Sequence, residues 1–147
     1  MPGMPASGHC RATSSEIRIS IPMTHPTTTL SRFETVTPRL PVADVEKALA
    51  FYVDQLGFRL GWTWGTPVTH ANVCRDAISL DLFLMPAGRG GAAMAYIQLS
   101  DVNAYYLELK GRNLAVSEPE DRPYGMRDFE VVDQDGNRLV FGEPAVH

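Results

Sequence analysis

Three side chains of the sequence, His70, Asp81 and Glu143, could take part in acid-base or metal chemistry. Imidazole and carboxylate groups are the usual acids and bases of enzymes, and they bind divalent metals when they converge on one point. His70 and Asp81 lie on consecutive predicted strands, so they form a conceivable acid-base pair. A histidine that shares a strand face with Asn72 and Cys74 is more often a hydrogen-bonded wall residue than a ligand. We expect that role for His70.

The segment DQDGN, residues 133–137, imitates the start of a calcium-binding loop, since Asp133, Asp135 and Asn137 alternate along it. That loop requires glycine at its sixth position, where this chain has Arg138. Gly136 lies between two strand-like runs, so we predict a hairpin turn whose residues serve backbone geometry. The sequence also lacks the spacings of Ser-His-Asp or Cys-His catalysis and the GxxxxGK[ST] phosphate loop.

Aromatic side chains form the second set of candidates. Trp62 and Trp64 alternate on one predicted strand and therefore share a face. Phe83, Tyr96 and Tyr124 lie on or beside other predicted strands. Such rings either pack in a core or form a surface on which flat ligands stack. As a set on faces that we expect to be open, they favour ligand stacking.

Composition limits the kinds of partner. The chain has 147 residues and 44% hydrophobic content, which fits one domain, and its net charge of -4 favours a neutral or cationic ligand over nucleic acid. Cys10 and Cys74 form no CxxC pair, so we expect reduced thiols rather than a disulfide framework or a zinc site. No apolar run is long enough for a membrane span or a signal peptide. We therefore expect a cytoplasmic protein that binds neither membranes nor nucleic acid.

The first 31 residues differ in composition from the rest. They are rich in Ser, Thr, Pro and Gly and show no regular spacing of apolar residues. This composition predicts a disordered N-terminal extension over residues 1–31 and a single domain over residues 32–147. Because Met23 opens a more ordinary N-terminus, the sequence leaves open whether the natural chain starts at Met1 or Met23.

One order of elements occurs twice in the predicted domain, with modules at about 33–86 and 92–144. In the first module Asp44 caps a helix and Gly57 ends it; in the second, Asp101 is the cap. The loop at residues 86–92 separates the modules. The predicted strands and helices are strand 34–42, helix 45–56, strands 58–65, 68–74 and 78–85, then strand 93–99, helix 102–113, and strands 114–119, 125–132 and 137–143.

The two modules also match each other in sequence. VADVEKALAFY (42–52) aligns with LSDVNAYYLEL (99–109), an offset of 101 − 44 = 57 residues between the capping aspartates. This indicates an internal duplication and an α+β fold of two βαβββ modules, which form a cup-shaped mixed sheet with helices on the outer face. Along ISLDLFLM (78–85), we expect Ile78, Leu80, Leu82 and Leu84 to face the helix. Ser79, Asp81, Phe83 and Met85 then line the cup.

Three stretches together resemble a known family: RLPVADVEKALAFYVDQLGF (39–58), AYIQLSDVNAYYLEL (95–109) and RPYGMRDFEVVDQDGNRLVFGEP (122–144). They resemble the glyoxalase, bleomycin resistance and extradiol dioxygenase superfamily, also called vicinal oxygen chelate proteins, over about residues 33–143. The closing motif is especially similar to the bleomycin resistance branch. The resemblance implies a homodimer with cups at or beside the subunit interface. Pro38 resembles a proline of the relatives at the point where the N-terminal strand crosses to the partner subunit, so the resemblance also implies exchange of this strand.

The same resemblance assigns metal-ligand positions on the first, fourth, fifth and eighth strands. In this sequence they fall at or next to Pro38, at Asp81, near Met94 and at Val140. Pro38 and Val140 have no donor atom, and a thioether such as that of Met94 is a poor ligand for hard metals. Glu143 lies three residues beyond Val140, so we expect it on the opposite face. One remaining carboxylate does not hold a metal, so the interpretation needs no cofactor.

The function that the resemblance implies is non-catalytic binding and sequestration of a small aromatic ligand, of the bleomycin type. Its alternative is a metal-dependent glyoxalase-like lyase or dioxygenase that uses displaced ligands such as His70, Asp81 and Glu143. A third possibility is that the same fold binds an unrelated metabolite. The predicted ligand-binding residues are Trp62, Trp64, His70, Asp81, Phe83, Tyr96, Gln98, Tyr124 and Arg127.

Overall fold

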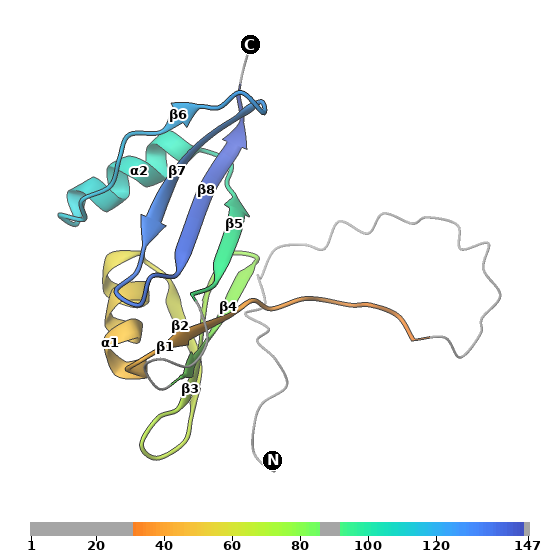
Figure 1. Ribbon diagram of the computed structural model, residues 1–147, viewed down its shortest axis with the longest axis vertical. Coiled ribbons are helices and arrows are strands. Elements are labelled where there is room, and N and C mark those ends of the chain that lie inside the picture. The colour runs from red at the N-terminus through yellow and green to blue at the C-terminus, as the bar shows by residue number, and fades with distance from the viewer. Residues whose placement is uncertain (1–30, 86–91, 146–147) are drawn as a thin grey trace.

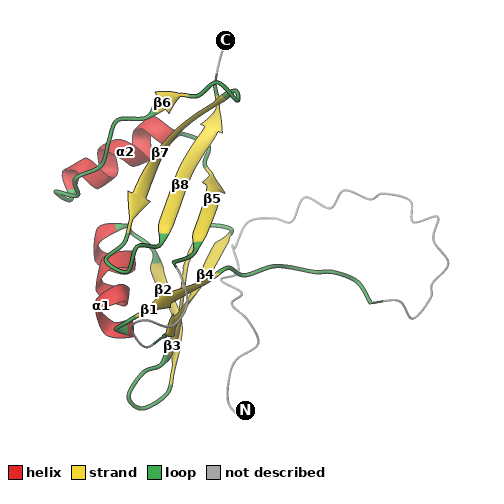
Figure 2. Ribbon diagram, in the orientation of Figure 1, coloured by secondary structure: helices red, strands yellow, loops and turns green. Residues whose placement is uncertain are grey.

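The computed structural model describes residues 31–85 and 92–145 of the chain. These residues form two four-stranded sheets, with strand orders β1-β4-β3-β2 and β5-β8-β7-β6, and the helices lie on the same side of both (Figures 1 and 2). In each sheet the parallel pair is β1 with β4 or β5 with β8, and the other pairs are antiparallel. The predicted α+β fold of two repeated modules with mixed sheets is therefore confirmed.

The observed elements follow the predicted order. The first module contains β1 (Arg39–Val42), α1 (Val45–Leu49), the π-helical η1 (Ala50–Gln55), β2 (Arg59–Trp64), β3 (His70–Arg75) and β4 (Ile78–Leu84). The second contains β5 (Met94–Gln98), α2 (Val102–Gly111), β6 (Glu120–Asp121), β7 (Met126–Val132) and β8 (Arg138–Pro144).

The two helices begin as their sequences predict. The carboxylate of Asp44 accepts from the Lys47 backbone N–H, and that of Asp101 accepts from the Ala104 backbone N–H, each at 3.0 Å. The first helix then widens into η1 and ends where Gly57 adopts φ 79°, a left-handed conformation that suits glycine. Both N-caps and the glycine stop are confirmed.

Two predicted strands differ from the observed ones. Residues 34–38 form no strand, and with β1 beginning at Arg39 the segment 31–38 leaves the sheets as an extended, largely exposed chain (Figure 1). The predicted strand at 114–119 is irregular: Leu114 and Val116 pack against the core, and the segment pairs with no described strand. The strand that pairs with β7 there is the short β6.

The hairpin turn at residues 133–137 joins the two modules. The Asp133 carboxylate accepts from the Tyr52 hydroxyl at 2.8 Å and from the backbone N–H groups of the turn. Asn137 is fully buried, donates to the Pro41 carbonyl at 2.8 Å and accepts from the Ala93 N–H at 2.7 Å. The segment is the predicted turn, and it also binds the first module through buried side chains.

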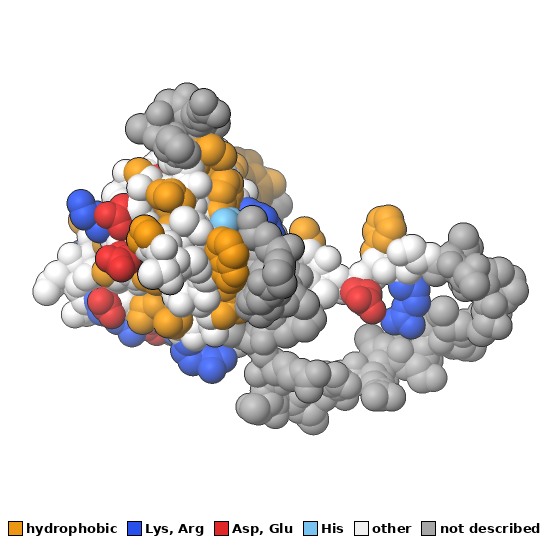
Figure 3. Space-filling model, turned by 90° about the horizontal axis from the view of Figure 1, so that it is seen from below, with side chains coloured by type: hydrophobic (Ala, Val, Ile, Leu, Met, Phe, Trp, Pro, Cys, Tyr) orange, Lys and Arg blue, Asp and Glu red, His pale blue; other side chains and the backbone are white. Residues whose placement is uncertain are grey.

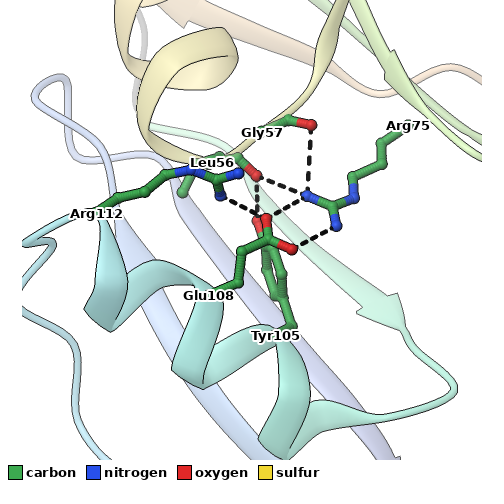
Figure 4. A network of polar contacts seen from close by, with 6 residues as sticks. All are labelled: Leu56, Gly57, Arg75, Tyr105, Glu108 and Arg112. Atoms are coloured by element: carbon green, nitrogen blue, oxygen red, sulfur yellow. Dashed lines mark hydrogen bonds and ion pairs between the residues drawn. The ribbon is translucent and has the colours of Figure 1, made fainter.

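A second polar network joins the modules near the end of the first helix (Figure 4). The Glu108 carboxylate on α2 accepts from Arg75 on β3, at 2.6 and 2.8 Å, and from Arg112 one turn along its own helix. Arg75 also donates to the Leu56 carbonyl at 3.2 Å, and the Tyr105 hydroxyl donates to the same carbonyl at 2.8 Å. The two modules are therefore joined by two separate hydrogen-bonded networks.

Some predictions fall on residues that the structure does not describe. The extension at residues 1–31, apart from Ser31, and the loop at 86–91 lie outside the described residues. Cys74 is buried on β3 and is disulfide-bonded, which contradicts the reduced thiol expected there. Spacing along the sequence does not measure which cysteines approach in space. Among the described residues, no helix is long and apolar enough to cross a membrane.

Candidate functional site

The face of each sheet opposite the helices, here called the open face, carries most of the predicted site residues. In the first module Leu40, Leu80 and Leu82 are buried and turn toward the helix. The last strand residue, Leu84, is 43% exposed, so the predicted leucine face is buried only in its middle. Alternation along the paired strands places the other side chains on the open face, namely Arg39, Trp62, Trp64, His70, Asn72, Asp81 and Phe83.

Three rings of this face, those of Trp64, His70 and Phe83, lie side by side at one end of the sheet. The Trp64 ring meets the His70 ring edge-on, with centroids 5.6 Å apart, and His70 pairs across the sheet with Phe83. Figure 3 shows hydrophobic side chains, in orange, on either side of a histidine, in pale blue. The predicted role of His70 as a wall residue fits its contact with the Thr69 hydroxyl at 3.0 Å.

A buried polar group occupies the centre of the first open face. The Asn72 side-chain amide donates to Asp81 at 2.8 Å and to the Ser79 hydroxyl at 2.7 Å. Asp81 is 4% exposed and lies 3.6 Å from the Arg39 guanidinium. The indole Nε1 of Trp62 and the Asn72 side-chain oxygen are buried with no hydrogen-bond partner among the described residues. A buried donor or acceptor without a partner is costly, so this face has unused hydrogen-bonding capacity.

The strand that carries both tryptophans bends at Gly61. Its pairing with β3 shifts register between Leu60 and Trp62, which marks a β-bulge. A Cβ at position 61 would lie only 2.1 Å from the Asn72 side-chain oxygen, so any larger residue there would displace the Asn72 side chain. The bulge places Trp62 opposite Asn72 and Trp64 opposite His70, and it thereby sets both indoles on the open face.

The second open face has a different centre. Alternation from the buried Ile97 and Phe141 places Met94, Tyr96, Gln98, Asp128 and Val140 on it. Asp128 is 2% exposed and was not among the predicted ligand-binding residues. Its carboxylate accepts from the Tyr124 hydroxyl at 2.5 Å, from the Tyr96 hydroxyl at 3.2 Å and from Arg122 Nε at 2.8 Å.

This cluster shifts the pKa values of its members. Burial, the negative charge of Asp128 and the hydrogen bond to it raise the pKa of Tyr96 to about 12. The hydrogen bond to Asp128, burial and the carboxylate charge also raise the pKa of Tyr124. Burial acts to raise the pKa of Asp128, but hydrogen bonds from Tyr124, Arg122 and Tyr96 outweigh it and lower that pKa. Near neutral pH the cluster is therefore one carboxylate held by two neutral phenols and a guanidinium.

The structure places Arg127 away from the other predicted residues. It alternates with Asp128 along β7 and turns to the helix side, where it donates to Asp121 and to Asn103, each at 3.2 Å. The prediction that Arg127 lines the ligand site is not supported by this geometry. The odd-even alternation of a strand separates two adjacent residues that the sequence motif keeps together.

Gln98 and Glu143 also have neighbours outside the aromatic set. Gln98 helps to line a hollow of about 440 Å³ between α2, the β3–β4 turn and the end of β5, on the helix side of the junction. Glu143 alternates away from Val140, as predicted, and accepts from the Val102 backbone N–H at 3.2 Å. It does not share a face with His70 and Asp81.

The residues at the implied metal positions do not fit a divalent metal. Asp81 supplies one carboxylate, which is already bound by Asn72. Met94 is 67% exposed on β5, Val140 pairs with Tyr96 on β8, and the Pro38 carbonyl accepts the Asp81 backbone N–H at 2.9 Å. A metal site needs several hard donors that converge, and these four positions provide one. Within the described residues, no three His, Cys, Asp or Glu side chains form a group that could hold a metal.

Comparisons with known proteins agree with this fold. A bleomycin resistance protein from Geobacillus stearothermophilus is 28% identical over 131 residues, covering 71% of this chain and 92% of that protein. A bleomycin resistance determinant encoded on the transposon Tn5 superposes with a TM-score of 0.68 at 22% identity, covering 78% of this chain and 100% of that one. A bleomycin-binding protein complexed with bleomycin superposes with a TM-score of 0.65 at 22% identity, covering 77% and 100%.

The sequence itself matches a family over most of its length. The matching description is Glyoxalase/Bleomycin resistance protein/Dioxygenase superfamily, and the match covers residues 29–141. These residues include both modules from the segment before β1 into β8. The chain therefore belongs to the glyoxalase, bleomycin resistance protein and dioxygenase superfamily.

Proposed function

We propose that this protein binds and sequesters a flat aromatic antibiotic of the bleomycin type between the aromatic side chains of its open faces, without chemical turnover. The observation that carries the proposal is the register of the strands. It puts Trp62, Trp64 and Phe83 on one open face and Tyr96 on the other, with the ring of Tyr124 tethered beside it. Stacking needs accessible rings, and Tyr96 and Tyr124 are 47% and 63% exposed.

The chemistry of the open faces supports binding rather than catalysis. The one carboxylate among the implied ligand positions, Asp81, is engaged by Asn72, and its neighbouring acid-base candidate His70 contacts Trp64 and Thr69. The relatives named above as bleomycin resistance and bleomycin-binding proteins support the class of ligand. The net charge of -4 suits a cationic or metal-chelated drug.

We also propose that the binding form is a cytoplasmic homodimer in which the segment before β1 crosses to the partner. Met94 and Val132 are 67% and 48% exposed on the second open face, and such apolar surface is typical of an interface. In segment 31–38, Phe33 and Val36 are 102% and 88% exposed, so this segment has apolar side chains that a partner subunit could bury. Sedimentation equilibrium tests this proposal: a dimer supports it, and a monomer at micromolar concentration contradicts it.

Isothermal titration with bleomycin tests the binding itself. We expect saturable binding with micromolar or tighter affinity, and recovery of the intact drug from the complex by mass spectrometry. No heat and no binding at micromolar drug would leave the family assignment intact but reject this ligand, in favour of an unrelated metabolite. Recovery of a modified drug would reject sequestration.

Metal analysis separates the proposal from a metal-dependent lyase or dioxygenase. Protein purified without chelators is measured for nickel, zinc, iron and manganese. We expect substoichiometric metal that does not affect bleomycin binding. One bound metal per chain, lost in an Asp81→Asn variant, would contradict the proposal and favour an enzyme.

A further inference from the structure

The polar cluster on the second open face combines features that are seldom found together. Tyr96 and Tyr124 have exposed rings, yet both hydroxyl groups are hydrogen-bonded to one nearly buried carboxylate oxygen of Asp128. Exposed tyrosines usually direct their hydroxyl groups into water. Here both hydroxyl groups donate hydrogen bonds to a nearly buried carboxylate, while the rings remain accessible to solvent.

The other Asp128 oxygen is bound from a third direction. Arg122 Nε donates to it at 2.8 Å, while Arg122 Nη1 donates to Glu120 on β6 at 3.0 Å. The carboxylate thus has donors on both oxygens, and charge-assisted hydrogen bonds of this kind are stronger than neutral ones. Rotation of the Asp128 side chain would break all three contacts at once, so its orientation is fixed.

Gly142 provides the space that the cluster needs. Tyr96 lies on β5 and Asp128 on β7, with β8 between them, so the Tyr96 side chain must cross β8 to reach the carboxylate. A Cβ at position 142 would lie 2.1 Å from the Tyr96 hydroxyl and 3.0 Å from Asp128 Cβ. The absence of a side chain at Gly142 is therefore part of the same arrangement.

We propose that Asp128 is a positioning residue of the ligand site, whose carboxylate holds the Tyr96 and Tyr124 rings in a fixed orientation for stacking. The inference rests on the proposed function, which supplies the ligand. The positioning of the two rings rests on contacts in the ligand-free structure. Freezing a side chain on binding costs affinity, and a ring that is already fixed avoids that cost. Asp128 acts through the two phenols and does not touch the ligand.

The first arm of the test uses the ligand-free protein. NMR measures the χ1 rotamer averaging of Tyr96 and Tyr124, which reports motion of the ring axis and hence of the hydroxyl on it, and the pKa of Tyr96, in the unaltered protein and in Asp128→Asn. We expect faster ring motion in the variant and a Tyr96 pKa below about 12, because the negative charge that opposes ionisation is gone. Unchanged ring motion and pKa in a folded variant would overturn the proposal.

A second variant guards against misfolding of the first. Gly142→Ala places a Cβ 2.1 Å from the Tyr96 hydroxyl and 3.0 Å from Asp128 Cβ, so it displaces the hydroxyl strongly and Asp128 only slightly, and the atoms nearest to that Cβ belong to neither Tyr124 nor Arg122. We expect a larger increase in the motion of the Tyr96 ring than of the Tyr124 ring. Equal loosening of both rings, or of neither, would contradict the geometry on which the proposal depends.

The second arm measures bleomycin affinity in a double-mutant cycle. Asp128→Asn should weaken binding about 3- to 10-fold in the unaltered protein and leave it unchanged in the Tyr96→Phe, Tyr124→Phe background. An equal loss in both backgrounds would mean that Asp128 contacts the drug directly, and would overturn the positioning role. If the unaltered protein does not bind bleomycin, the proposed function fails, while the NMR arm still decides whether Asp128 orients the rings.

Discussion

The helix side of these sheets and the first open face satisfy their polar groups in opposite ways. On the helix side, Asn137 and Glu108 lie in junction networks whose donors and acceptors are paired across the two modules. On the open side, Trp62 Nε1 and the Asn72 oxygen have no partner among the described residues, and tyrosine rings are exposed. We infer that the helix side supplies stability and the open side supplies binding.

The largest effect should come from the junction turn. Asn137→Ala removes the partner of the Ala93 N–H and of the Pro41 carbonyl, and should lower the free energy of unfolding by about 3 kcal/mol. Urea denaturation measures this. The matched control is Asn103→Ala on the exposed surface of α2, for which we expect less than about 0.5 kcal/mol. Similar losses in both variants would remove the distinction between the two sides.

A smaller effect, of pH-dependent stability, should come from the Arg75–Glu108 network. Hydrogen bonds from Arg75, opposed by burial and aided by Arg112, lower the pKa of Glu108 to about 2. A lowered pKa stabilises the fold above the unfolded value, near 4.5, and this contribution disappears as the pH falls toward 2.

Replacing Glu108 with Gln should therefore cost about 1–2 kcal/mol at pH 7, allowing for its partial exposure, and progressively less between pH 4.5 and 2. Urea denaturation at several pH values gives the difference. Glu118→Gln, on an exposed loop, is the control. A constant difference between the Glu108 variant and the unaltered protein across that range would refute the role of this carboxylate.

A third prediction concerns the open side. Replacing Trp64 with Leu removes a stacking ring and should weaken bleomycin binding about 10-fold, with a change in unfolding free energy below about 1 kcal/mol. Phe51→Leu is the matched control, because Phe51 is a partly buried aromatic residue packed against the core on the helix side. The Phe51→Leu variant should have a lower free energy of unfolding and an unchanged affinity for bleomycin. The reverse pattern would place the binding function on the helix side.

The smallest effect distinguishes the two arginines of the closing motif. Arg127→Ala should change bleomycin affinity less than about 2-fold, because this residue lies on the helix side with Asp121. Arg122→Ala should weaken binding about 3-fold, because it removes a donor that fixes Asp128. Titration calorimetry measures the bleomycin affinity of both variants. A larger loss of affinity in Arg127→Ala than in Arg122→Ala would place Arg127 in the ligand site.

Much of the fold was predictable because local signals determine it. The aspartate caps predicted where both helices begin, and Gly57 predicted where the first one ends. The repeated order of elements predicted the two modules. The strand predicted at 114–119 was wrong, because apolar residues can pack against a core without pairing. The β6–β7 pairing depends on contacts that sequence pattern does not record.

The site was predictable where alternation along one strand was enough. Trp62 and Trp64 share the open face as expected, and Glu143 turns away from it. Asp128 was missed as a site residue because its role depends on Tyr96, which is 32 residues away and separated from it by β8. The glycine at position 142, which allows that contact, was the available sign, but its meaning requires the strand register.

The most direct test of the binding account observes the two indole N–H groups, because Trp62 and Trp64 are the only tryptophans in the chain. Their nitrogen-15 NMR signals are followed while bleomycin is added to the full-length protein. The account predicts that both signals shift and saturate together at one drug-binding affinity. Saturable binding with both indole signals unmoved would contradict it and place the ligand elsewhere.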